Sequence, residues 1–114
     1  MSRHDPLVRL RHMRDFAERA LALVQDKTRS EVESDEVLLL ALTHLVELIG
    51  EAASRVGPDT REKYGAIPWP KVVSTRNRLI HGYDYIDHDI LWTTISQNLP
   101  DLLCQLDSIL SQCE

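Results

Sequence analysis

Residues 76–83 place a guanidinium, an amide, an imidazole and a phenol within about two helical turns. The guanidinium of Arg76 is always charged and presents a planar fork of donors that matches phosphate oxygens. The imidazole of His81 is of the side-chain type that moves protons near neutral pH, since its ordinary pKa is about 6.5. One cation for phosphate and one group for proton transfer, with no set of metal ligands beside them, are the minimum needed to cleave RNA by acid–base chemistry.

Such cleavage assigns a role to each polar residue of the motif. His81 serves as the base that takes the ribose 2′-hydroxyl proton, or as the acid that protonates the leaving oxygen. Arg76 holds the phosphate in the transition state, while Asn77 and Arg78 support substrate binding. Because the chemistry requires a 2′-hydroxyl, the expected substrate is RNA rather than DNA.

Structural roles for the same residues remain open at this point. Arg76 is also suited to pair with a carboxylate on a neighbouring helix. His81 is also suited to cap a helix C-terminus, where the helix dipole favours a cation. Tyr83 is equally suited to be a core or interface aromatic residue.

The composition favours one all-α domain spanning residues 1–114. Hydrophobic residues make up 43% of the chain and aromatic residues only 5%, so the core must consist of Leu, Val, Ile and Ala. The net charge of −5 argues against non-specific coating of nucleic acid. However, residues 55–81 carry six Lys or Arg against two carboxylates, a net charge of +4, whereas residues 82–114 carry no Lys or Arg. The basic block coincides with the motif and suits a phosphate-bearing partner.

Hydrophobic periodicity predicts a compact bundle of four to five helices. The first helix opens at Asp5-Pro6, and an acidic loop over residues 26–35 follows it. Ser34 or Asp35 caps the second helix, which Gly57-Pro58 stops.

The second half of the chain is predicted to hold two more helices. A connector over residues 59–68, with at most one short helical turn, leads to a third helix that starts near Pro68-Trp69-Pro70 and ends at Gly82. Asp87 caps the last helix, and Pro100 is expected to kink or split it because proline removes a hydrogen bond and crowds the preceding turn.

The second predicted helix carries a stripe of polar and small residues that includes Glu47 and Gly50. A glycine there allows another helix to approach closely, and the carboxylate is suited to pair with an arginine; a solvent-facing stripe is the alternative. His44 lies three residues before Glu47, but two residues do not form a metal site. Neither a metal nor a cofactor is expected.

The spacing of the motif points to a dimer. On one helix, Asn77 and His81 lie one turn apart on the same face, whereas Arg76 and His81 diverge by about 140°. A two-fold dimer that brings two copies of the motif together would build a composite site from two arginines and two histidines.

A cytoplasmic protein is expected, with no membrane association. The N-terminus lacks an apolar leader, and no stretch approaches the roughly 18 apolar residues of a membrane span. Cys104 and Cys113 lie nine residues apart on one predicted helix, about 13 Å of rise, which is too far for a disulfide. They are interpreted as reduced, partly buried thiols.

The motif and its flanks resemble the HepT-like toxins of the HEPN superfamily. The resemblance rests on an Ile67-Pro68-Trp69 lead-in, on Arg76-Asn77 followed by Leu79-Ile80-His81-Gly82-Tyr83, and on an upstream stretch over residues 44–53. An Arg, four residues and a His are weak alone, but the combination is specific, and the similarity extends over nearly the whole chain.

This resemblance implies a helical bundle that dimerises around the motif helix and acts as a metal-independent endoribonuclease toxin. Arg76 and His81 would be its catalytic residues. The implied antitoxin is a minimal nucleotidyltransferase that transfers AMP from ATP to Tyr83 and that can form a larger hetero-oligomer with the toxin. For the RNA substrate, an unpaired segment of mRNA or a tRNA end is favoured over a duplex.

The sequence is also compatible with a hypothesis from a different functional class. The chain would then be a non-catalytic accessory subunit that binds nucleotide or docks on a nucleotidyltransferase and keeps the motif for complex formation.

Overall fold

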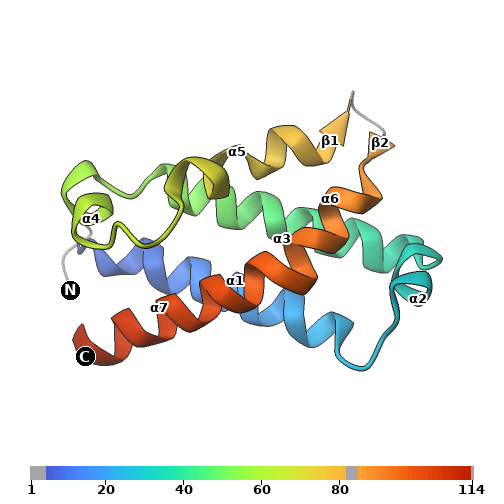
Figure 1. Cartoon of the computed structure of the whole chain (residues 1–114), viewed down its shortest axis with the longest axis horizontal. Coiled ribbons are helices and arrows are strands. Elements are labelled where there is room, and N and C mark those ends of the chain that lie inside the picture. The colour runs from blue at the N-terminus through green and yellow to red at the C-terminus, as the bar shows by residue number, and fades with distance from the viewer. Residues whose placement is uncertain (1–4, 82–84, 114) are drawn as a thin grey trace.

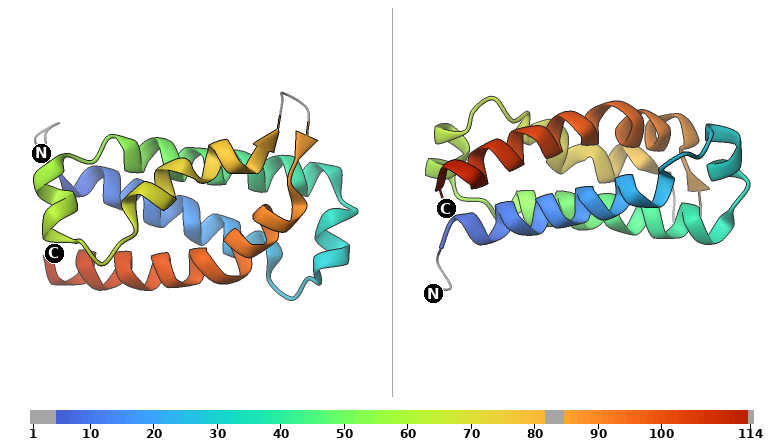
Figure 2. Two further views of the ribbon diagram at one scale, coloured as in Figure 1. Left: turned by 45° about the horizontal axis from the view of Figure 1, so that its top comes forward. Right: turned by 90° about the horizontal axis from the view of Figure 1, so that it is seen from below.

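Helices dominate the fold, which confirms the all-α prediction. The computed structural model describes residues 5–81 and 85–113. The long helices in chain order are α1 (Leu7–Val24), α3 (Glu36–Ser54), α5 (Trp69–Leu79) and α7 (Leu99–Cys113), and the chain reverses direction from each of them to the next (Figures 1 and 2). The N- and C-terminal ends therefore lie at the same end of the bundle (Figure 1).

Short elements connect the long helices. They are α2 (Arg29–Glu33), α4 (Pro58–Lys63), α6 (His88–Thr93), a π-helical turn η1 (Thr94–Asn98), and the strands β1 (Ile80–His81) and β2 (Tyr85–Ile86). The two strands pair antiparallel and, together with α2, lie at the end of the bundle opposite the termini (Figure 1).

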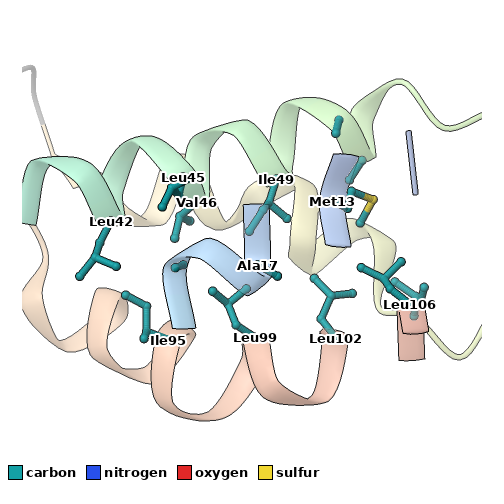
Figure 3. Close-up of a cluster of buried hydrophobic side chains, with 14 of the residues drawn as sticks. Met13, Ala17, Leu42, Leu45, Val46, Ile49, Ile95, Leu99, Leu102 and Leu106 are labelled. Carbon is teal, nitrogen blue, oxygen red and sulfur yellow. The ribbon is translucent and has the colours of Figure 1, made fainter. Parts of the chain in front are cut away.

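The core lies where α1 packs on α3 and α7 (Figure 3), and it extends to the contact of α3 with α5. It consists of Leu, Ile, Val and Ala together with Met13 and Trp69, as the composition predicts. The indole Nε1 of Trp69 donates to the carbonyl oxygens of Arg61 and Tyr64, both at 3.2 Å. This buried tryptophan therefore fixes the start of α5, the helix that carries the motif.

Aspartates begin the helices where the sequence predicts them. The Asp35 carboxylate accepts the Leu38 N–H at 3.0 Å at the start of α3, and the Asp5 carboxylate accepts the Leu7 N–H at 2.9 Å ahead of α1. Both satisfy backbone donors that the first helical turn leaves without a partner.

The prediction of a loop over residues 26–35 is wrong, because this stretch contains α2. The Thr28 hydroxyl accepts the Glu31 N–H at 3.1 Å while the Glu31 carboxylate accepts the Thr28 N–H at 2.9 Å. This reciprocal capping box stabilises a single turn of helix, and Val32 buries its side chain beneath it.

The structure refines the boundary at Gly57-Pro58. The helix α3 already ends at Ser54, and Gly57-Pro58 begins α4, the one short helix of the connector. Arg61 of α4 reaches back to the end of α3, where its guanidinium donates to the carbonyls of Ala53 (2.9 Å) and Val56 (3.1 Å).

Pro100 interrupts the last helix, as predicted. It lacks the N–H that would continue an α-helical ladder, and the turn before it widens so that the Leu99 N–H bonds the carbonyl of Thr94. The interruption appears as the π turn η1 between α6 and α7.

The structure bears on two further expectations, the absence of a membrane span and the partial burial of the cysteines. The helix α3 is long and apolar enough by composition to cross a membrane, with a mean hydropathy of 1.6, although half of that window is buried inside the bundle. A core helix of a water-soluble protein meets the same criterion, so this feature alone is weak support for a membrane span. Cys104 is exposed rather than partly buried.

Candidate active site

The motif helix ends earlier than the sequence predicts. The expected helix runs to Gly82, but α5 ends at Leu79 and the chain continues as β1. Ile80 pairs with Ile86 and His81 with Tyr85, while the Leu79 carbonyl accepts the Asp87 N–H at 2.8 Å. Two β-branched isoleucines that pack together against the core favour the extended conformation over another helical turn.

His81 therefore projects from a strand, on the exposed face of the hairpin. Successive side chains of a strand alternate, so His81 shares its face with Tyr85 directly opposite and with Asp87 on the diagonal. The imidazole centroid lies 5.9 Å from that of the Tyr85 ring, and its Nε2 lies 3.5 Å from the Asp87 Oδ2. More than half of the His81 side chain, 57%, remains exposed.

Asp87 joins this histidine to the next helix. Its carboxylate accepts the Ile90 N–H at 3.0 Å and so caps α6, as the sequence predicts. The pKa of Asp87 is lowered, chiefly by that backbone hydrogen bond, further by the N–H of Asp89, and then by the charge and proximity of His81. An ionised carboxylate is thus held beside the imidazole at neutral pH.

Arg76 lies on α5 and contacts α3. Its Nε is 3.3 Å from the Glu47 Oε2, and 58% of its side chain is exposed. A Cβ on Gly50, one turn further along α3, would come within 3.4 Å of the Val72 carbonyl oxygen, so the two helices pack closely here. The predicted pairing of an arginine with Glu47 beside a glycine contact is therefore confirmed.

The other motif residues occupy different positions. Asn77 is exposed on α5, and Arg78 donates through Nη2 to the Thr75 hydroxyl at 3.0 Å. The prediction that Asn77 and His81 share one helical face is wrong, because His81 has left the helix. Tyr83 lies outside the described residues.

The structure does not join Arg76 to His81 by a direct contact among the residues it describes. Each has its own carboxylate instead: Glu47 beside the guanidinium and Asp87 beside the imidazole. Both functional groups remain largely exposed while one edge of each is held, which suits groups that must meet a large substrate.

The sequence analysis did not identify two neighbours of His81, Tyr85 and Asp87, as part of the site. The pattern assigns Asp87 only to a helix cap and assigns no role to Tyr85. A hairpin pairing of Ile80 with Ile86 would have revealed both, since it places Tyr85 and Asp87 on the face of His81. The two isoleucines that flank a Gly-containing segment were the available signal.

Among the residues that the structure describes, no group of three or more His, Cys, Asp or Glu side chains is arranged to hold a metal ion. His44 is exposed on α3.

Comparison with known proteins places this all-α, HEPN-like bundle in a family. Residues 9–109 match the family described as Ribonuclease HepT-like. The chain is 31% identical over 103 residues to "Putative RNase TTE0752" of Caldanaerobacter subterraneus subsp. tengcongensis, an alignment that covers 90% of this chain and 92% of the relative. It is 30% identical over 95 residues to "Probable ribonuclease HepT" of Thermococcus cleftensis, covering 80% and 86%.

A third relative, "Putative RNase MJ1380" of Methanocaldococcus jannaschii, is 28% identical over 109 residues, which cover 96% of this chain and all of the relative. No solved structure gives a significant match. The chain belongs to the HepT-like ribonuclease family. The family and the names of these relatives support a ribonuclease.

Proposed function

We propose that this protein is a metal-independent endoribonuclease that acts as a homodimer, with Arg76 and His81 as its catalytic residues. The observation that carries the proposal is the pair of exposed groups, each oriented by one carboxylate: Arg76 by Glu47 and His81 by Asp87. Membership of a ribonuclease family supports the same reading. Asn77 and Arg78, exposed on the same helix, would assist substrate binding.

The proposed reaction is an attack within the RNA strand. The ribose 2′-oxygen bonds to phosphorus while the bond from phosphorus to the 5′-oxygen of the next nucleotide breaks. One imidazole takes the 2′-hydroxyl proton and a second, protonated imidazole gives its proton to the departing 5′-oxygen. The products are a 2′,3′-cyclic phosphate and a free 5′-hydroxyl, and the guanidinium of Arg76 stabilises the charge on the phosphate oxygens.

This chemistry explains why one chain is insufficient. The two proton transfers need a base and an acid at the same moment, and the motif supplies one imidazole per chain. A second copy related by a two-fold axis supplies the other histidine and a second guanidinium. Asp87 would position the imidazole and stabilise its protonated form.

The surface next to Arg76 suits such a partner. Val37 and Leu40 expose 77% and 57% of their area on α3. Helical geometry puts them on the same face as His44 and Glu47, so an exposed apolar stripe runs toward the pair of Arg76 with Glu47. A second copy covering this stripe would bring its own Arg76 and His81 beside those of the first copy.

Regulation would act through Tyr83. As the family resemblance implies, we propose that a minimal nucleotidyltransferase antitoxin modifies this toxin: the phenolic oxygen attacks the α-phosphorus of ATP, pyrophosphate leaves, and AMP remains on Tyr83. The modification adds an anion and a bulky group two residues from His81, which would compete with RNA phosphate for Arg76. RNA and ATP are both cytoplasmic, and we place the protein there.

Cleavage is tested with purified protein, free of AMP by intact mass, incubated with a mixed-sequence RNA in excess chelator. Wild type should cleave, and His81→Ala and Arg76→Ala should each lose at least about a hundredfold in rate. His12→Ala and Arg55→Ala, which remove an exposed histidine of α1 and an exposed arginine at the end of α3, should cleave like wild type. Absence of cleavage by the unmodified wild type would favour the accessory-subunit reading, and equal cleavage by every variant would indicate a contaminating nuclease.

Modification is tested with ATP and a minimal nucleotidyltransferase of the proposed class. Intact mass should rise by whole AMP additions in wild type and in Tyr85→Phe, the control at a neighbouring tyrosine, but not in Tyr83→Phe. Additions that persist in Tyr83→Phe would exclude Tyr83 as the acceptor.

A further inference from the structure

A cleft lies along the first turns of α5, which contribute Lys71, Val72 and Thr75 to its lining. Its volume is about 240 Å³, and it lies between α3, α5, η1 and α7. The walls are mainly apolar, formed by Val46, Ile49, Val72, Leu99 and Leu102. An apolar cavity of roughly 150 Å³ is enough to bind benzene, so this cleft has room for one planar ring system.

The π turn shapes the rim of the cleft. Because Pro100 cannot donate a backbone hydrogen bond, the preceding turn widens and the Leu99 N–H reaches the Thr94 carbonyl. Thr94 and Asn98, at the two ends of this turn, both line the cleft. Turns of this type are frequent at functional sites.

A second hollow of about 180 Å³ continues the cleft toward the hairpin end. It shares Lys71, Thr94 and Asn98 with the first and adds Arg78 and Asp89. Lys71 and Arg78 are seven residues apart, or two turns, on the same face of α5. One groove thus carries two cations, Lys71 and Arg78, and two carboxylates, Asp89 and Asp101, beside an apolar pocket.

The cations in the basic block of residues 55–81 differ in whether protein groups already hold them. Three of its six cations are held by carboxylates or backbone carbonyls: Arg55 by Glu51, Arg61 by the carbonyls of Ala53 and Val56, and Arg76 by Glu47. Arg78 donates to the hydroxyl of Thr75. Lys63 lies over the Tyr64 ring at 5.5 Å. Lys71 and Arg78 have no carboxylate partner within the described part of the chain, and both line the groove.

Asn98 adds hydrogen-bonding capacity at the mouth. Its amide is half-buried and makes no hydrogen bond to any described side chain or backbone group. An amide offers both donors and an acceptor, the combination that reads the edge of a nucleobase. Asp89 does not compete for Arg78, because it is paired with Arg29 of α2.

From these features we infer that the cleft binds one unpaired nucleotide of the RNA substrate, with its base in the apolar pocket against Asn98 and its flanking phosphates on Lys71 and Arg78. Lys71 and Arg78, two helical turns apart, offer a cation to each flanking phosphate, and the pocket has room for one ring system. Asp101 at the pocket lining offers a carboxylate acceptor to the amino groups of a base. This inference rests on the proposed ribonuclease function and adds a recognition subsite to it.

The subsite flanks the reaction centre and is separate from it. Helical geometry separates Arg76 from Lys71 by about 140° around α5. A strand held in the cleft would pass around the end of α5 at the hairpin before reaching His81. The protein should therefore require unpaired RNA on one side of the cleaved bond.

Binding is tested in a His81→Ala background, so that cleavage does not interfere. The probe is a fluorescein-labelled 12-nucleotide single-stranded RNA, titrated at several salt concentrations. Lys71→Ala combined with Arg78→Ala should raise the Kd about tenfold and lower the salt slope by about 1.4, which is two single-strand phosphate contacts. Lys63→Ala, a matched lysine outside the groove, should leave both values unchanged. Unchanged values in the double variant, with a wild-type melting temperature, would overturn the subsite.

The base pocket is tested separately with Asn98→Leu, which keeps the side-chain size and removes the amide. It should lower the preference among homopolymeric RNA 12-mers while leaving the salt slope unchanged. An unaltered ranking of the four homopolymers would show that Asn98 does not contact a base.

Kinetics separate the subsite from the nuclease. If wild type cleaves RNA, the double variant at Lys71 and Arg78 should raise KM about tenfold with little change in kcat. An unchanged KM would contradict the subsite but not the proposed nuclease activity. If wild type does not cleave but RNA binding depends on Lys71 and Arg78, the subsite stands without the nuclease. A third outcome, tight binding of free AMP that RNA does not displace, would contradict the RNA assignment.

Discussion

At the scale of single residues, the two motif side chains share one arrangement: a largely exposed functional group with a carboxylate at one edge. Glu47 holds the guanidinium of Arg76, and Asp87 holds the imidazole of His81. The first pairing follows from sequence reasoning, because a carboxylate beside a glycine on the second long helix invites an arginine. The pairing of Asp87 with His81 was not predicted, because His81 was expected on a helix and its partners lie across a pair of strands.

Asp87→Asn separates the two roles of this residue. Asparagine caps helices about as well as aspartate, so α6 should keep its cap, and the variant should stay folded and lose only the stabilisation that comes from the charge of Asp87. The imidazole loses its charged partner, and kcat for RNA cleavage should fall about tenfold with KM nearly unchanged. Comparison with Tyr85→Phe, which keeps the neighbouring ring, controls for packing. A wild-type kcat in Asp87→Asn would exclude a positioning role.

The lowered pKa of Asp87 also predicts how stability depends on pH. Its ordinary value is 3.8 and the folded value is lower, so the unfolded chain takes up the proton first as the pH falls. The stabilisation is therefore complete above about pH 4 and is lost as the pH drops through the folded pKa. Urea unfolding between pH 7 and pH 3 measures the free energy of unfolding of wild type and of Asp87→Asn. The difference between the two values should shrink as the pH falls. If the difference in unfolding free energy does not change with pH, the Asp87 carboxylate is not the source of the pH dependence.

At the scale of elements, the position of the site depends on where α5 ends and how closely it packs on α3. The long helices were predictable, because apolar residues recur at three- and four-residue steps and each start has an Asp or a Pro. The short elements were not, since two-residue strands carry too little periodicity and depend on pairing across residues 82–84. The helix α2 was readable in principle from Thr28 and Glu31, the two ends of a capping box.

Gly50 provides a test of the contact between α3 and α5. An alanine methyl would meet the Val72 carbonyl oxygen at 3.4 Å and that of Val73 at 3.6 Å, which is close to ordinary contact. Gly50→Ala should therefore raise the melting temperature by a few degrees, since alanine favours a helix by about 1 kcal/mol over glycine. Gly50→Leu should lower it and reduce cleavage by moving Arg76 away from Glu47. Equal melting temperatures for the two variants would show that the helices are not in close contact here.

At the scale of the whole molecule, the exposed apolar stripe on α3 and the need for two imidazoles both call for a second copy. Leu40→Glu places a charge in the middle of that stripe, 57% exposed in one chain. The variant should remain folded by circular dichroism, shift from dimer to monomer by light scattering, and lose RNA cleavage. Leu23→Glu, a change at another exposed leucine on α1, should remain dimeric and active. A monomeric wild type that cleaves RNA would contradict the proposal that the active protein is a dimer.

The most direct measurement mixes wild type with His81→Ala at constant total protein, after subunit exchange. If each active site needs the histidine of both chains, the cleavage rate should follow the square of the wild-type fraction, so that an equal mixture retains about a quarter of the full rate. Mixed dimers should be present by native mass spectrometry at the statistical proportion. A rate that falls linearly, to about half in the equal mixture, would show that each chain cleaves RNA alone and would contradict the composite site.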